Sequence, residues 1–141
     1  MEKKSTDDLR QELMSQPDLK AYIHDNQEFF TDRNMLELLK RLYERSGISK
    51  AELARRSCIS EVYLHQVFSG RRRPSRDRLL CICIGLEATL EETQDLLKLE
   101  GYAQLYPKRK REAIITHGIV HHTDLEQLND GLFAENEKTL F

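Results

Sequence analysis

Basic side chains gather in one stretch in the middle of this 141-residue chain. Residues 50–78 carry eight basic and three acidic side chains, a net charge of +5, although the whole chain has a net charge of −2. Three of them, Arg71, Arg72 and Arg73, are consecutive. Guanidinium groups bind phosphate through charge-assisted hydrogen bonds, and a phosphate-binding face depends on where the charge lies rather than on its total. The pattern favours binding to nucleic acid over the alternative, a solvated charged loop.

Two short helices separated by a tight turn precede these arginines. The first, predicted over residues 49–57, opens with a capping box in which Ser49 is followed three residues later by Glu52. The second, predicted over residues 60–69, begins at the capping residue Ser60. Two helices joined in this way are typical of a helix-turn-helix unit.

The rest of the chain also has helical periodicity, and no alternating strand pattern is present. We therefore expect an all-α fold. Gly118 is expected to end one helix, and Thr123 to open the last one with another capping box. Besides short N-terminal pieces, the predicted helices run over residues 32–46, from Ser75 to about 86, from Thr89 to Glu100, from Pro107 to His117, and from 123 to about 129.

The run GISKAELARRSCISEVYLHQVFSGRRRPSRDRLLCICIGL, residues 47–86, resembles the Cro/CI-type (XRE) helix-turn-helix family. The shared pattern is a helix-capping Ser followed by E-L-A, an aliphatic–serine turn, a glycine, a basic stretch, P-S and spaced leucines. The resemblance covers residues 35–86. It implies a lambda-repressor-like helical bundle, here with extra N- and C-terminal helices, whose third helix lies in the major groove of DNA.

One departure from the family pattern predicts a contact. The family usually has a glutamate two residues before the helix-ending glycine, paired with an arginine on the first helix. Here those positions are Phe68 and Tyr43. An aromatic contact in place of a buried ion pair is often neutral or stabilising, because two charges need not be desolvated. We interpret the chain as a divergent member, to which the family's base preference cannot be transferred.

The resemblance and the helical spacing agree on the two sides of the third helix. Leu64 and Val67, three residues apart, face the core. The outer side then holds four candidate base-reading residues: Glu61, Val62, Tyr63 and Gln66. Glutamine can pair with adenine, glutamate can accept from the cytosine amino group, and an apolar or aromatic side chain can contact the thymine methyl group. The alternative for Glu61 is a first-turn acid that stabilises the helix dipole.

Phosphate contacts are expected from basic side chains and from the starts of the two helices, whose backbone N–H groups are natural phosphate donors. The candidates are Ser49, Lys50, Ser60, Arg71, Arg72 and Arg73. A second basic run, residues 108–111, could contact flanking phosphates or remain solvated.

No enzymatic site is predicted. His117 and His121 are four residues apart, as in helical metal sites, but we expect Gly118 to interrupt that helix and find no obvious fourth ligand. Three cysteines without metal-type spacing argue against a disulfide framework. We expect no catalytic residues, no metal and no cofactor.

The sequence predicts a transcriptional regulator that binds double-stranded DNA in a sequence-specific way. We expect it to act as a repressor and as a homodimer. The alternative is an antitoxin-like or adaptor module that binds protein through its N-terminal arm or its C-terminal hairpin. The apolar residues of that hairpin either complete the core or form part of a dimer interface.

We expect an arm over 1–30, a DNA-binding domain over 31–103 and the hairpin with its tail over 104–141. Without a long apolar run or a signal-peptide pattern, we expect a cytoplasmic protein that does not enter membranes.

Overall fold

The computed structural model describes residues 4–141, with residues 31–33 described by their backbone alone, and this part of the chain is helical throughout, without a strand. The expected all-α class is confirmed. In the described part no helix is long and apolar enough to cross a membrane. The elements are α1 (Thr6–Ser15), α2 (Leu19–Asp25), the 3-10 turn η1 (Gln27–Phe29), α3 (Thr31–Ser46), α4 (Lys50–Ser57), α5 (Glu61–Phe68), α6 (Arg76–Gly85), α7 (Leu90–Leu99), α8 (Lys110–Val120) and α9 (Leu125–Ala134).

The helix starts follow from their capping residues. Thr89 makes a complete capping box, because its hydroxyl accepts from the backbone N–H of Glu92 and the Glu92 carboxylate accepts from that of Thr89. The box predicted at Ser49 is only half formed. The Ser49 hydroxyl accepts from the Glu52 N–H at 3.1 Å, but the Glu52 carboxylate turns to two arginines on the same helix.

Two predictions near the C-terminus are wrong. Gly118 does not end α8, which continues to Val120. A Cβ atom at Gly118 would lie 2.2 Å from a side-chain carbon of Leu128, so the glycine allows α8 and α9 to pack closely. The last helix is capped by Asp124 rather than by Thr123, and it continues beyond 129 to Ala134.

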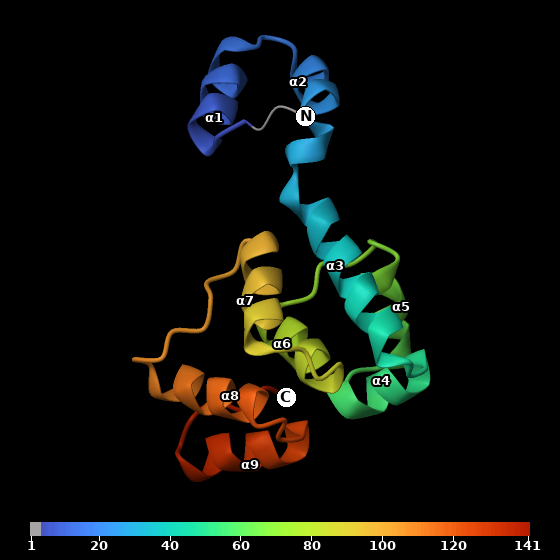
Figure 1. Cartoon of the computed structure of the whole chain (residues 1–141), viewed down its shortest axis with the longest axis vertical. Coiled ribbons are helices and arrows are strands. Elements are labelled where there is room, and N and C mark those ends of the chain that lie inside the picture. The colour runs from blue at the N-terminus through green and yellow to red at the C-terminus, as the bar shows by residue number, and fades with distance from the viewer. Residues whose placement is uncertain (1–3) are drawn as a thin grey trace.

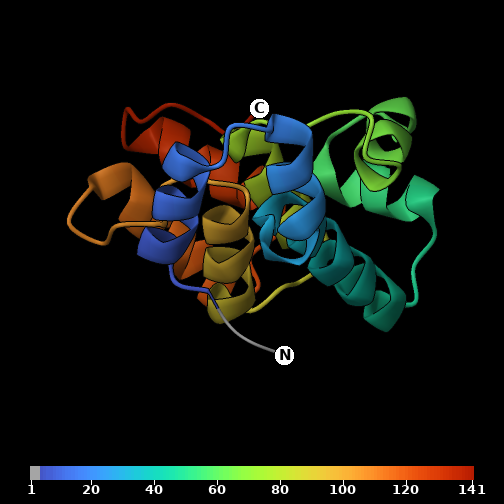
Figure 2. The ribbon, with the colours of Figure 1, turned by 90° about the horizontal axis from the view of Figure 1, so that it is seen from above.

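One core joins α3 to α9, and α6 lies in its middle, packed against α4, α7 and α9. Figures 1 and 2 show α4 and α5 on one side of α6 and the C-terminal helices α8 and α9 on the other. The residues predicted to face inward from α4 and α5 are buried, which confirms that part of the helix assignment: Leu53, Ala54, Leu64 and Val67.

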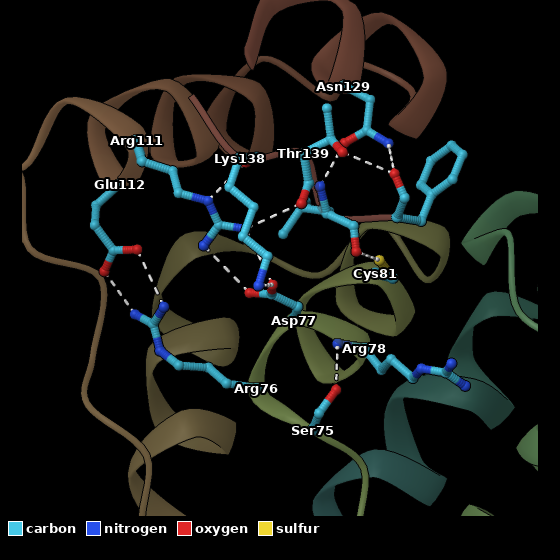
Figure 3. Close-up of polar contacts among 12 residues, drawn as sticks. Ser75, Arg76, Asp77, Arg78, Cys81, Arg111, Glu112, Asn129, Lys138 and Thr139 are labelled. Atoms are coloured by element: carbon cyan, nitrogen blue, oxygen red, sulfur yellow. Dashed lines mark hydrogen bonds and ion pairs between the residues drawn. The ribbon is translucent and has the colours of Figure 1, made fainter. Parts of the chain in front are cut away.

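The C-terminal hairpin of α8 and α9 completes this core. Its inward-facing residues are buried, whereas Val120 and Phe133 are exposed. The buried set is Ile115, Ile119, Leu125, Leu128 and Leu132. The tail is docked as well: Leu140 is buried, and its N–H donates to Asn129 Oδ1 at 2.8 Å (Figure 3).

Two crossed ion pairs hold α8 on the start of α6 (Figure 3). The Arg76 guanidinium binds the Glu112 carboxylate through both oxygens at 2.6 and 3.1 Å. Arg111 binds the Asp77 carboxylate in the same way at 3.1 and 3.2 Å. Each helix thus contributes one acid and one base from adjacent positions, which fixes the register of the two helices.

The N-terminal helices α1 and α2 pack on each other, and Figure 1 shows them beyond the N-terminal end of α3, away from the C-terminal hairpin. Their shared contact buries Tyr22 and Asn26. Four apolar side chains on these helices remain exposed: Leu13, Met14, Leu19 and Ile23. The domain boundaries proposed at 30 and 103 stay a prediction.

Candidate nucleic-acid interface

The helix-turn-helix unit consists of α4, a tight turn and α5. The turn depends on Cys58, whose φ of 52° is left-handed, and on Ile59, whose N–H donates to the Ala54 carbonyl at 3.1 Å. The Ser60 hydroxyl then caps α5 by accepting from the Tyr63 N–H at 3.1 Å. Since α4 packs on both α5 and α6, the position of α5 is fixed by the core.

Three of the four candidate base-reading residues lie at the surface of α5. Glu61 is exposed, Val62 is 67% exposed, and Gln66 is half-buried. Tyr63 is only 7% exposed, so the prediction that it lies on the outer face is wrong. Tyr63 and Val67 are four residues apart and therefore lie on the same side of the helix. The buried face of α5 thus includes Tyr63 in addition to Leu64 and Val67.

The Tyr63 ring instead contacts the guanidinium groups of two arginines. The Cζ atom of Arg72 lies 5.0 Å from the ring centroid, and that of Arg78 on α6 lies 4.5 Å from it. Both distances fit cation–π contacts. Arg78 was not among the predicted site residues, because its distance from Tyr63 in the sequence gives no local signal of the contact.

Lys50 also contacts aromatic rings, those of Tyr43 and Phe68. The predicted contact between Tyr43 and Phe68 is confirmed: their rings meet edge to face, with centroids 5.3 Å apart. The Lys50 ammonium lies 4.3 Å from the Tyr43 centroid and 4.4 Å from the Phe68 centroid. A half-buried cation therefore lies on two ring faces, at the positions where the resemblance to the Cro/CI family implies an ion pair. The sequence predicted the ring pair but not its cation.

Arg73 has a different environment. Its Nε donates to a carboxylate oxygen of Glu100 at 2.7 Å, and its Nη2 donates to the Glu100 backbone carbonyl at 2.7 Å. Its guanidinium also lies over the Tyr102 ring at 4.4 Å. The hydrogen bond with Glu100 raises the pKa of Arg73. Arg73 therefore ties the basic loop to the end of α7.

Other cations of this region are also neutralised within the chain. Glu52 pairs with Arg55 and Arg56, and the hydrogen bonds from these two arginines lower the pKa of Glu52 to about 2. Of the second basic run, Lys110 pairs with Glu135 and Arg111 with Asp77, so half of that run is neutralised as well.

The remaining cations of the basic segment share one property. In the described part of the chain no carboxylate forms a salt bridge with any of them: Lys50, Arg71, Arg72 and Arg78. All four flank or follow α5 in the fold. Guanidinium and ammonium groups without an acidic partner, close to a helix with exposed side chains, are suited to binding DNA phosphates.

The two histidines expected to be separated at Gly118 lie on one continuous helix, the second as its C-cap. His117 and His121 stack at 4.2 Å between ring centroids, because α8 continues through Gly118. Across residues 4–141 no group of three His, Cys, Asp or Glu side chains is placed to hold a metal ion.

Residues 35–96 match the model of a helix-turn-helix domain family, which covers a little under half of the chain. Comparisons with curated proteins and with solved structures give no match. The matched segment spans α4, the turn, α5, α6 and most of α3 and α7. The fold and this match define a helix-turn-helix domain, a class that binds DNA with its second helix.

Proposed function

We propose that the protein is a sequence-specific double-stranded DNA-binding transcriptional regulator of the Cro/CI type, and that it acts as a repressor. The observation that carries this proposal is that four cations without an acidic partner lie next to α5. Lys50, Arg72 and Arg78 lie on rings of α5, and Arg71 follows its C-terminal end. The other basic residues of the segment, Arg55, Arg56, Arg73 and Arg76, have acidic partners, and this supports a role of the remaining four in binding phosphate.

In this proposal α5 enters the major groove. Gln66 pairs with adenine, Glu61 accepts from a cytosine amino group, and Val62 contacts a thymine methyl group. The starts of α4 and α5, at Ser49 and Ser60, offer backbone N–H groups to phosphates. Lys50, Arg71, Arg72 and Arg78 contact phosphates and supply the affinity that does not depend on sequence. Arg73 supports the loop through Glu100.

Two copies bound to a near-palindromic site would give the affinity that one short recognition helix lacks. A repressor of this kind acts by occupying a promoter. We therefore propose a homodimer on DNA, with one α5 in each of two successive turns of the major groove.

Selection of bound sequences from random duplex DNA, followed by salt titration, tests the proposal. We expect one enriched motif and a slope of log K against log salt of about −3.6 for each bound protomer, since four cations contribute about −0.9 each. Absence of any enriched motif at low salt would contradict the proposal.

An adaptor function is the second candidate, and the exposed apolar residues of the N-terminal helices favour it. Leu13, Met14 and Leu19 are 50%, 82% and 64% exposed. The DNA selection separates the two candidates, because an adaptor predicts no enriched motif and no dependence on Gln66.

A further inference from the structure

A cavity of about 330 Å³ lies where the C-terminal ends of α4, α6 and α8 meet the first turn of α9. Its apolar lining comes from several elements of the core and includes Ile84, Ala88, Ile119 and Leu125. The volume is within the range of small-molecule sites, which bury an apolar part of the ligand and orient it through a few polar groups.

The three helix ends at this cavity are built alike. Each has a left-handed residue that is not glycine: Cys58, Glu87 and His122, with φ of 52°, 53° and 52°. The residue after each donates its N–H to a carbonyl five residues back, at distances of 2.9 to 3.1 Å. This is the Schellman cap, in which glycine is the usual left-handed residue. Here all three positions carry side chains that line the cavity.

The cavity is electronegative. The end of each of the three helices carries partial negative charge, and the carboxylates of Glu87, Asp124 and Glu126 line the cavity. Two cations, Arg55 and Arg56, also line the cavity and share the Glu52 carboxylate. Counted with Glu52, the charged side chains here are four acids and two arginines, so the balance is negative, although Asp124 also caps the positive end of α9.

The environment of the Cys58 thiol agrees with this charge distribution. Burial raises its pKa, and the nearby carboxylates of Glu126 and Asp124 raise it further. Besides Cys58, the carboxylates and the two arginines, the lining contains one more titratable residue, His122.

We propose that this cavity binds a small organic cation, an ammonium or guanidinium group on a short apolar stem. The apolar lining takes the stem, and the carboxylates and helix ends around it hold the charged group. An anionic ligand of the same size would also meet Arg55 and Arg56, but it would face three carboxylates and three helix C-termini.

The position of the cavity also connects it to the helix-turn-helix unit. Arg55 and Arg56 belong to α4 and Cys58 to the turn before α5, whereas Gly118 and Ile119 belong to the C-terminal hairpin. An occupant would contact both parts at once. If the protein binds DNA as proposed above, the cation would therefore act as an effector that changes DNA affinity, and DNA would change cation affinity by the same factor.

Titration of the full chain with n-butylguanidinium, without DNA, tests the site itself. We expect saturable binding and NMR shifts of the backbone amides of Cys58, Glu87 and His122, whereas n-butanoate should cause neither. The double variant Glu87→Gln/Glu126→Gln should weaken cation binding at least tenfold. Glu91→Gln, which removes one acid outside the cavity, should leave it unchanged.

No binding at millimolar concentrations, amide shifts elsewhere in the chain, or equal binding of butanoate would overturn the proposal. The amide shifts of the wild-type chain show whether the cation binds in this cavity, even if the double variant does not fold. The effector role is tested separately, by DNA titration with and without n-butylguanidinium. We expect DNA affinity to change at least twofold in the wild type and not in the double variant. An unchanged DNA affinity would contradict the effector role. The cation titration without DNA would still show whether the cavity binds the cation.

Discussion

Replacing Tyr63 by leucine tests whether this ring positions the arginines that bind DNA. Leucine keeps an apolar side chain at a position that is 7% exposed, but it removes the ring face from Arg72 and Arg78, which lie 5.0 and 4.5 Å from its centroid. A cation–π contact at an exposed site is worth about 0.5–1 kcal/mol, so the two together are worth about 1–2 kcal/mol. This corresponds to roughly 5- to 30-fold weaker DNA binding.

The assay is DNA titration at one fixed salt concentration with the selected sequence. Tyr63→Phe is the matched control, because it keeps the ring and should bind as wild type. A double-mutant cycle separates positioning from folding: Arg72→Ala should have a smaller effect in the Tyr63→Leu background than in wild type. The reasoning is refuted if the leucine and phenylalanine variants bind equally, or if the effects of the two substitutions simply add.

Three further outcomes follow from the charge assignments. Arg72→Ala should make the salt slope of DNA binding shallower by about 0.9, whereas Arg55→Ala, whose arginine is paired within α4, should change it little; parallel salt titrations compare them. Glu112→Leu should lower the free energy of unfolding by about 2–3 kcal/mol in urea titrations, because Arg76 loses its acidic partner and keeps only backbone carbonyl acceptors. Pairing with an arginine of α3 lowers the pKa of Glu92 to about 2, so its contribution to stability is present above pH 4.5 and lost as the pH falls toward 2. Urea midpoints of wild type and Glu92→Gln across this range should converge at low pH.

Local patterns in the sequence predicted a large part of the fold. Capping residues placed the starts of α4, α5 and α7, and the substitution of an ion pair by Tyr43 and Phe68 correctly predicted a ring contact. These features depend on spacing within a helix or on a known family geometry. The prediction that Gly118 ends a helix is wrong, because a contact with Leu128 in the facing helix, and not the local sequence, determines the role of this glycine.

The parts of the site that the sequence did not predict involve contacts between distant segments. Nothing in the local pattern of Lys50 indicates that its ammonium lies on two rings, or that Tyr63 is covered by Arg78. Arg73 belongs to the same run of arginines as Arg71 and Arg72. Only the fold brings Glu100 to it and so distinguishes it from its two neighbours.

The most direct measurement of the central claim is a comparison of two selections from random duplex DNA, with the wild-type chain and with Gln66→Ala. We predict that the wild type enriches one motif. The variant should keep that motif but lose the preference at one base position, by about 1–3 kcal/mol, because Gln66 no longer pairs there. If the wild type enriches no motif, or if both proteins enrich the same motif with the same preference at every position, α5 does not read DNA in the proposed way.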